Sequence, residues 1–549
     1  MTSSNPPSAA PGSIESCLAA YHDALNRESV GSARARLVDA LDGASEDMWL
    51  DCGRRLVLAR ELDTAIDVFE RGTACHPASA DLRTGLAGLY WQADRRGDAE
   101  NMLRGGLSTF PGDVGATFLL ARLLFEQGRV QGAADAIKEL FEHGHYDADT
   151  AIQAVELMDD FGRAEDALHI CKVAMVSHPD DPRLHAYAGM LGIQLGEFER
   201  VRTHYEFALA HADGAVEWNI PIGLSCLQRY TDDRHPDLTF FREVLDRVEL
   251  SEKARTNTMF ALGKALDDLA DYGEAARYFR AGNARARTVS SWSRKQWRRK
   301  VAAHCAASPV PWTLPAPVAW TPVFIVGVPR SGTTLLAELM ARHPLVTNRG
   351  ELGWLQTLAE SLPASSREPR KSFEEAASVY ATHLLQDDSD AGWYIDKQPL
   401  NLLYIDLIMA WWPNAKIIYC QRDARDTALS LWSQSFQDRA HDYACDFTDI
   451  GALIQGCRRL MIHWNRRYPS SIRAIRYEDL VQSPQESVTS IVDWLGIPTQ
   501  VDRSPANRHG GSIATASVWQ ARQPVYTGAV GRWKNYADYI PELLLLPEH

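Results

Sequence analysis

Small and apolar residues recur in the first half of the chain with a period of about 34 positions. In the first unit these residues are Trp49, Gly53, Leu56, Ala65, Phe69, Gly72 and Pro77. The last six of these positions recur 34 residues later as Ala87, Tyr90, Ala99, Leu103, Gly106 and Pro111. The register continues through units near Ala121, Met158 and Gly189 and returns from Leu262 to Gly282. Apolar residues at this spacing predict pairs of antiparallel helices, in which small residues permit close approach and large ones fill the seam.

Neighbouring pairs must stack, because one pair cannot bury its apolar face alone. This pattern resembles the tetratricopeptide repeat, which implies a superhelix with a concave surface. Two functions stay open for it. The array either supports the rest of the chain or holds a peptide or protein partner, such as the acceptor of a reaction.

Short apolar runs alternate with helical patterns in the second half of the chain. The predicted strands are residues 323–327, 345–347, 393–395, 415–420 and 472–476. This alternation predicts a mainly parallel sheet covered by helices, with ligands outside the carboxyl ends of the strands. Four tryptophans at helical positions are expected in the core: Trp411, Trp412, Trp432 and Trp464.

A basic stretch, residues 292–300, and a run of prolines, residues 309–322, separate the two patterns. Proline removes an amide donor and fixes φ, so this run predicts a stiff connector between domains. A length of 549 residues also exceeds one ordinary core. We therefore expect a helical array over residues 1–290, a connector over 291–321 and an α/β domain over 322–549.

The composition is that of a globular protein, with 45% hydrophobic and 23% charged residues. The 57 basic and 71 acidic residues give a net charge of −14. This balance argues against nucleic acid or an anionic membrane as a general partner.

Cysteine usage and hydropathy indicate where the chain works. The nine cysteines form no C-x-x-C pair, and their odd number leaves one unpaired, which favours a reducing compartment. Residues 1–12 lack the apolar core of a signal peptide, and no run reaches the roughly 18–20 apolar residues of a transmembrane helix. We expect a cytoplasmic protein without a transmembrane segment.

The segment from Gly327 to Thr334 has the form of a phosphate-binding loop. It follows an apolar strand and leads into a helix, so backbone N–H groups and the positive helix end converge on an anion. Its spacing matches G-x-x-x-x-G-K-[ST], except that Thr333 stands in the lysine position. That lysine contacts the β- and γ-phosphates of a triphosphate. Its absence suggests a nucleotide with one phosphate-like 5′ group, such as a phosphosulfate.

A second anion site is predicted at the end of the strand over 415–420. Arg422 follows the strand, and Ser430 lies about two helical turns later. A guanidinium binds phosphate bidentately, and a hydroxyl adds a donor. Nucleotide hydrolases often carry a magnesium-binding aspartate at such a strand end, so a cation there favours direct charge pairing over metal binding.

Together these segments resemble the sulfotransferases that use 3′-phosphoadenosine-5′-phosphosulfate (PAPS). The likeness is to the tyrosylprotein sulfotransferase branch and to bacterial enzymes that join such a domain to tetratricopeptide repeats. It implies a P-loop-like α/β fold, sulfuryl transfer that releases 3′-phosphoadenosine 5′-phosphate (PAP), and no metal.

The resemblance also implies a set of cofactor-binding residues. For the 5′-phosphosulfate these are Pro329, Arg330, Ser331, Gly332, Thr333 and Thr334. Arg422 and Ser430 would bind the 3′-phosphate, Tyr477 would contact the nucleotide, and Arg532 would reach the cofactor from the end of the chain. Gln434 stands where animal members have a further arginine.

Three residues are candidates for catalysis. Glu351 matches the glutamate of this branch and would take the proton of the acceptor hydroxyl. Arg330 and Lys397 would neutralise the charge of the leaving bisphosphate. His343 is a rival base, although its place between a helix end and Pro344 favours a capping or packing role.

Several functions remain open at this stage. The preferred one is sulfation of a hydroxyl, with a peptide tyrosine as the leading acceptor and a glycan or small alcohol as the next. A nucleotide kinase or ATPase, and a catalytically inactive repeat scaffold, are the alternatives. The sequence does not define the oligomeric state.

Overall fold

The computed structural model describes residues 13–144, 146–362, 369–436, 438–498 and 525–546. The chain forms two compact units, Met1–Tyr146 and Asp147–His549. Among the described residues, no helix is both long enough and apolar enough to cross a membrane.

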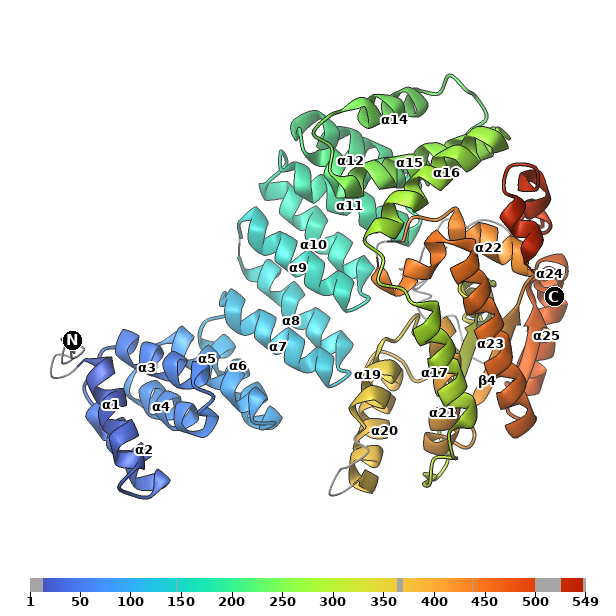
Figure 1. The fold of residues 1–549 in the computed structure, drawn as a ribbon. Helices are drawn as coiled ribbons and strands as arrows, with labels where there is room; N and C mark the ends of the chain where they lie inside the picture. The colour runs from blue at the N-terminus through green and yellow to red at the C-terminus, as the bar shows by residue number, and fades with distance from the viewer. Residues whose placement is uncertain (1–12, 145, 363–368, 437, 499–524, 547–549) are drawn as a thin grey trace, which may run out of the picture. The chain divides into compact units, whose positions relative to one another are not determined.

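The first unit consists of consecutive antiparallel helix pairs (Figure 1). Its helices are α1 (Ile14–Leu25), α2 (Val30–Ala40), α3 (Glu46–Leu58), α4 (Leu62–Cys75), α5 (Ala80–Gln92), α6 (Arg96–Thr109), α7 (Val114–Glu126) and α8 (Val130–His143). The helices α3, α5 and α7 begin at residues 46, 80 and 114, so the predicted repeat period is confirmed here.

The ring of Phe69 explains why small residues recur in this unit. A Cβ added at Gly53 would lie 2.1 Å from Phe69 Cε2, and one added at Gly85 would lie 2.5 Å from Cε1. The ring therefore lies between glycines of α3 and α5, and it joins its own helix pair to the next one.

The second unit begins with more helix pairs. They are α9 (Ala148–Asp160), α10 (Ala164–Ser177), α11 (Pro182–Leu195), α12 (Phe198–His211), α15 (Glu252–Asp268) and α16 (Tyr272–Thr288). The divergent stretch before α15 holds η1 (Ala215–Trp218), α13 (Ile220–Ser225) and α14 (Pro236–Asp246). The starts of α9 and α11, at residues 148 and 182, keep the register of the first unit.

The basic stretch forms α17 (Arg294–Ala306), which packs on α23 (Phe447–Arg467). Trp297 is buried between them, and its indole N–H donates to Ala452 O at 3.0 Å. The proline-rich segment that follows has no regular element. It lies along α21 (Ile405–Trp411), since Leu314 N donates to Ala410 O at 2.9 Å.

A five-stranded parallel sheet follows, with the order β2-β3-β1-β4-β5. The strands are β1 (Thr321–Gly327), β2 (Val346–Asn348), β3 (Trp393–Asp396), β4 (Lys416–Gln421) and β5 (Ile472–Arg476). Every predicted strand is confirmed within two residues at each end. The order changes direction beside β1, which is where ligands bind in sheets of this kind.

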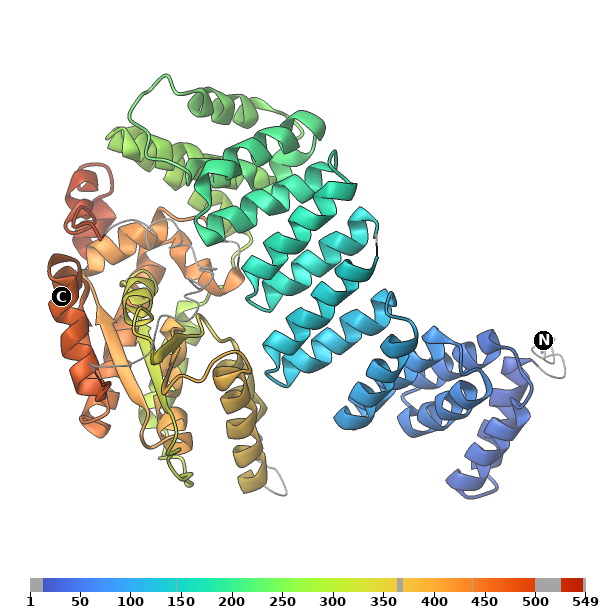
Figure 2. The same ribbon diagram turned by 180° about the vertical axis from the view of Figure 1, so that it is seen from behind.

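Helices cover both faces of the sheet. The remaining elements are α18 (Thr333–Met340), α19 (Trp354–Ser361), α20 (Pro369–Leu385), η2 (Pro399–Tyr404), α22 (Ala424–Trp432), η3 (Arg439–Cys445), α24 (Tyr477–Gln482), α25 (Pro484–Leu495), η4 (Arg532–Tyr536) and η5 (Pro541–Leu545). Val323 and Ile325 of β1 face a core shared with α18 and α25, whereas Phe324 and Val326 face one shared with α20, α21 and α23. Figure 2 shows α25 and α20 on opposite sides of the strands. The four tryptophans predicted to be core are all buried.

The second of these cores continues into the repeats. One apolar cluster runs from α11 through α15 and α16 to the sheet and to Leu546. Asn283 of α16 also donates to Trp432 O of α22 at 2.8 Å. The later repeats and the sheet are therefore packed as one body.

Candidate active site

The five strands present the predicted site residues along one edge of the sheet. In strand order, β2 is followed by Glu351, β3 by Lys397, β1 by the loop from Val328 to Gly332, β4 by Arg422 and β5 by Tyr477. Because all strands are parallel, their carboxyl ends lie at the same edge. The fold thus gathers residues that are far apart in the sequence.

The loop after β1 has a backbone that suits an anion. Arg330 and Gly332 have positive φ values of 73° and 94°, and Ser331 N donates to Val328 O at 3.0 Å. A Cβ at Gly327 would lie 2.7 Å from Cys420 O, so β1 and the neighbouring β4 approach closely here. The chain then enters α18 directly from Gly332.

Two further observations favour an anion at this loop. Gly332 is the N-cap of α18 and supplies no side chain to the first N–H groups, which leaves them to a ligand. Ser331 Oγ is buried and has no hydrogen-bond partner within the described part of the chain. These donors fit a phosphosulfate group.

Arg330, Arg422 and Ser430 lie together. Arg330 Nε donates to Ser430 Oγ at 3.1 Å, and Arg422 Nη1 donates to Arg330 O at 2.9 Å. Burial, and then the charge of Arg422, lower the pKa of the Arg330 guanidinium to about 10. Arg330 therefore remains charged at neutral pH, and two cations at this site repel each other until an anion binds.

Tyr477 joins the loop to the second arginine. The Arg422 guanidinium lies 4.5 Å from the centre of its ring, and a Cβ on Gly332 would come within 2.5 Å of its Cδ2. The next residue, Glu478, accepts a hydrogen bond from Asp423 N at 2.9 Å. The Tyr-Glu-Asp-Leu segment thus fixes β5 to the end of β4 and supports the loop.

Glu351 and Lys397 form an ion pair. Lys397 Nζ lies 2.5 Å from Glu351 Oε1, and the side chains are 2% and 32% exposed, in the order lysine and glutamate. Lys397 N also donates to Gly350 O at 2.7 Å. The predicted base and the predicted cation are therefore brought together by the pairing of β2 with β3.

Asp396 binds the backbone next to both partners of this pair. It is fully buried and accepts hydrogen bonds from Tyr380 OH, Asn401 Nδ2 (2.7 Å), Gln398 N (2.9 Å) and Leu352 N (3.4 Å). Burial raises the pKa of its carboxyl to about 7 against the lowering effect of these donors. The residues on both sides of the ion pair are thereby held in place.

Arg532 lies in a segment that we call the tail, residues 525–546. Its Nη2 donates to Asp267 Oδ2 at 2.6 Å. Burial would lower its pKa, but Asp267 and Tyr536 raise it above the ordinary value. The tail is also bound to the strand end, because Arg422 Nη2 donates to Ala529 O at 2.8 Å.

His343, the rival base, has both ring nitrogens engaged. Nδ1 accepts from Leu345 N at 3.2 Å, which leaves Nε2 to donate to Pro498 O at 3.1 Å. It follows the far end of α18, away from the loop. Its ring thus joins the turn before β2 to Pro498, which is a packing role, and it does not cap α18, whose C-cap is Ala341.

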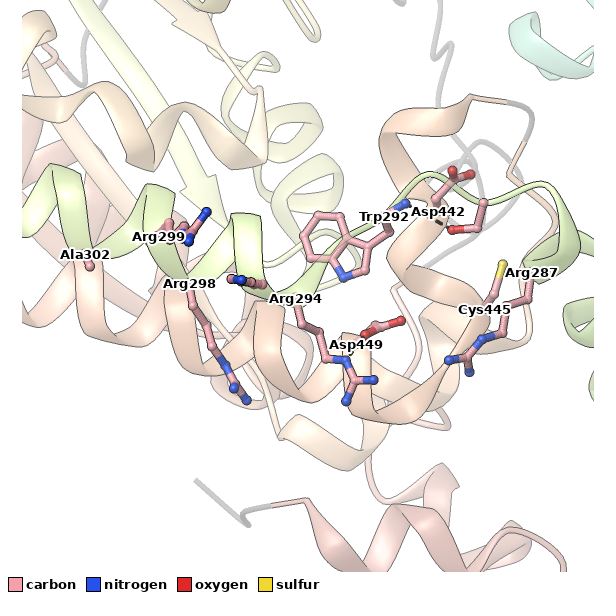
Figure 3. A pocket seen from close by; sticks show the side chains of 11 residues that line it. Arg287, Trp292, Arg294, Arg298, Arg299, Ala302, Asp442, Cys445 and Asp449 are labelled. Atoms are coloured by element: carbon pink, nitrogen blue, oxygen red, sulfur yellow. Dashed lines mark hydrogen bonds and ion pairs between the residues drawn. The ribbon is translucent and has the colours of Figure 1, made fainter.

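A cavity lies at the carboxyl end of β4. It has a volume of about 330 Å³ and is lined by Ser331, Arg422 and Arg458, together with residues of β4 and α22. A larger groove, of about 690 Å³, lies along α17, where Figure 3 shows Arg294 and Arg298 extending from the same side of the helix. The smaller cavity is lined by two of the predicted residues, Ser331 and Arg422, and it marks the nucleotide end of the candidate site. No group of three or more His, Cys, Asp or Glu side chains in the described ranges is arranged to hold a metal ion.

Sequence reasoning missed three carboxylates of this region. Asp396 fixes the ion pair, Asp267 binds Arg532, and Asp426 accepts from Gly531 N (2.6 Å) and Trp533 N (2.9 Å). Asp426 lies four residues after Arg422, but its partners are a hundred residues later in the chain. Only the folded structure reveals these pairings.

Comparison with known proteins identifies the domain. Residues 322–501 match the model of the sulfotransferase family. A protein-tyrosine sulfotransferase of Drosophila melanogaster is 26% identical over 264 residues, 41% of this chain and 51% of that protein. A protein of Aquifex aeolicus (strain VF5), whose name assigns no activity, is 29% identical over 245 residues, 41% of this chain and 32% of that protein.

The chain thus spans at most about half the length of these two relatives. Among solved structures, the sulfotransferase domain from the Synechococcus PCC 7002 olefin synthase is 20% identical, with a TM-score of 0.29 over 43% of this chain and 98% of that domain. A TM-score this low carries no argument about the fold, so the description of the sheet depends on its own strand order. The second half of the chain carries a sulfotransferase-family domain, preceded by tetratricopeptide-like helix pairs.

Proposed function

Since residues 322–501 match the sulfotransferase-family model, we propose that the chain transfers a sulfuryl group from PAPS to an acceptor hydroxyl, with a peptide tyrosine as the leading acceptor. The observation that carries this proposal is the loop after β1, in which Ser331 Oγ has no hydrogen-bond partner among the described residues and Arg330 and Arg422 lie together. The name of the Drosophila relative supports tyrosine over a glycan or small alcohol.

The residues of the loop would hold the 5′ end of the donor. Backbone N–H groups at Gly332, Thr333 and Thr334 would donate to its oxygens, and the Ser331 hydroxyl would add another donor. Arg422 and Ser430 would hold the 3′-phosphate, while Tyr477 and Pro329 shape the walls. When bound, PAPS supplies a sulfuryl group already activated by its bond to phosphate.

Glu351 would act as the general base. Its carboxylate takes the proton from the acceptor hydroxyl as the oxygen–sulfur bond forms. Lys397 carries three N–H donors, and one of them donates to Glu351. The other two can neutralise charge on the leaving oxygen. Arg330 adds a second cation at that oxygen.

A nucleotide kinase or ATPase is less well supported. Thr333 replaces the phosphate-loop lysine. Asp423, the carboxylate nearest the end of β4, already accepts from Arg425 N and Asp426 N as the N-cap of α22. The Asp423 carboxylate therefore caps α22, whereas a metal-binding aspartate would face the phosphates.

The test has two parts, made on the full chain. Calorimetry should detect PAP binding that does not need magnesium. Labelled PAPS with lysate from the source of the protein should yield a sulfated acceptor, which mass spectrometry identifies as tyrosine, glycan or small alcohol.

A matched pair of variants tests the base. Glu351→Gln should lower transfer by about 10²–10⁴-fold and leave PAP binding intact. Glu360→Gln, an exposed glutamate of α19, should behave as wild type. Absence of PAP binding by the wild-type chain would favour the inactive scaffold, and tight magnesium-dependent ATP binding would favour the kinase.

We also propose a role for the repeats and a location for the protein. The repeats would hold the peptide or protein acceptor. The cytoplasm is the proposed location, supported by the nine cysteines, all of which are free thiols in the structure.

A further inference from the structure

A carboxylate of the last repeat pair contacts the cofactor-site region. Asp267 stands near the end of α15 and is 15% exposed. Its Oδ2 accepts from Arg532 Nη2 at 2.6 Å, and its Oδ1 accepts from Tyr536 OH at 2.5 Å. One aspartate of the repeats thus binds two residues of the tail.

The backbone around Arg532 is fixed from the other side. Asp426 of α22 accepts from Gly531 N and Trp533 N, the residues that flank Arg532. Arg422 holds Ala529 O in the same stretch. With the backbone held by the sulfotransferase domain, the direction of the Arg532 side chain depends on Asp267.

The direction of the Arg532 side chain matters because its guanidinium is positively charged. Arg422 holds Ala529 O, three residues before Arg532, and both arginines lower the pKa of the Arg330 guanidinium after the larger effect of burial, so each of them repels Arg330. A flexible arginine would relieve this repulsion by turning towards solvent. Asp267 opposes that movement, since an ion pair holds the guanidinium where it is.

We propose that Asp267 is a positioning residue for the cofactor. It keeps Arg532 beside Arg330 and Arg422, so that the helix pair α15–α16 completes the cation cluster that receives a nucleoside bisphosphate. This inference rests on the proposed function for the identity of the ligand. The last repeat pair would then be a working part of the site as well as a support.

The experiment is a calorimetric titration of the full chain with PAP. Asp267→Asn should weaken binding roughly tenfold, and Asp267→Glu should recover most of that loss. Two controls should bind as wild type. Tyr536→Phe removes the other hydrogen bond to the same carboxylate, and Asp268→Asn changes the next residue of α15, which pairs with Lys264 at 2.7 Å.

A charge swap separates positioning from simple support. In the double variant Asp267→Arg with Arg532→Asp, the ion pair can re-form, so the melting temperature should recover relative to Asp267→Arg alone. PAP affinity should not recover, because the cation has moved. Recovery of affinity in the swap, or wild-type affinity in Asp267→Asn, would overturn the inference. A wild-type chain that binds no PAP would overturn the proposed function as well.

Discussion

Glu351 and Lys397 differ greatly in exposure, and this sets the energetic cost of losing either partner. Lys397 is 2% exposed and depends on Glu351 Oε1 at 2.5 Å for its charge balance. A buried charge that loses its partner is costly, whereas an apolar side chain of similar shape in its place is much less so.

We therefore expect Glu351→Ala to be more destabilising than Lys397→Met, although Glu351 is the more exposed residue. The free energy of unfolding should fall by about 3 kcal/mol in the first variant and by about 1 kcal/mol in the second. Chemical denaturation of both variants at pH 7 measures this. Equal losses would contradict the proposed difference in cost between the two partners.

Asp396 should make stability depend on pH. Burial raises its pKa to about 7, far above the roughly 3.9 of an unfolded aspartate. Between these values the folded state holds more protons than the unfolded state. Its contribution is therefore complete below about pH 4 and is lost as the pH rises towards 7 and beyond.

The expected loss is up to about 4 kcal/mol between pH 4 and pH 8. Melting temperatures across this range should fall less steeply in Asp396→Asn, which cannot titrate. Asp387→Asn, an exposed aspartate of the same region, is the control and should keep the wild-type slope. Identical slopes in all three chains would show that Asp396 is ionised throughout.

At the scale of elements, the helix pairs depend on a few glycines that touch aromatic rings. Gly53 of α3 has no space for a side chain, since its Cβ would lie 2.1 Å from the Phe69 ring. Gly105 of α6 is exposed and would have nothing within 4 Å of its Cβ. The two glycines belong to the same unit, so a single unfolding transition compares them.

Gly53→Ala should destabilise this unit by about 1–3 kcal/mol through overpacking. Gly105→Ala should stabilise it by about 0.5–1 kcal/mol, because alanine is the better helix former. Calorimetry of the full chain would measure both. A stable Gly53→Ala variant would show that Phe69 can move out of the seam.

The same elements show what sequence alone can predict. The five strands and the repeat register follow from apolar patterns within about 35 residues, and these were found. The loop at Gly332 is predictable because one short segment carries its glycines and hydroxyls. Asp267 and Arg532 were not paired, since 265 positions separate them and no local pattern links the two.

At the scale of the whole molecule, the later repeats and the sheet share one core. Asn283 is buried at their junction and donates to both Phe279 O and Trp432 O. Removal of its amide would leave Trp432 O without this donor. A buried polar group in that state costs about 1–3 kcal/mol.

Asn283→Ala should therefore lower the melting temperature of the second unit as a whole, and the repeats and sheet should still unfold together. Arg285→Ala is the control, since this half-buried arginine of α16 pairs only with Glu252 among the residues described. Two separate transitions in the variant would mean that the junction depends on this one amide.

The register of the sheet has a consequence for how the chain reaches this structure. Thr321 pairs with Trp393 and Val323 with Lys416, so each contact of β1 requires closure of a long loop. The helix pairs close much shorter loops and should form sooner. The helices α15 and α16 would then be formed before the sheet. The sheet would fold against their surface, so the repeats would act as a template for it.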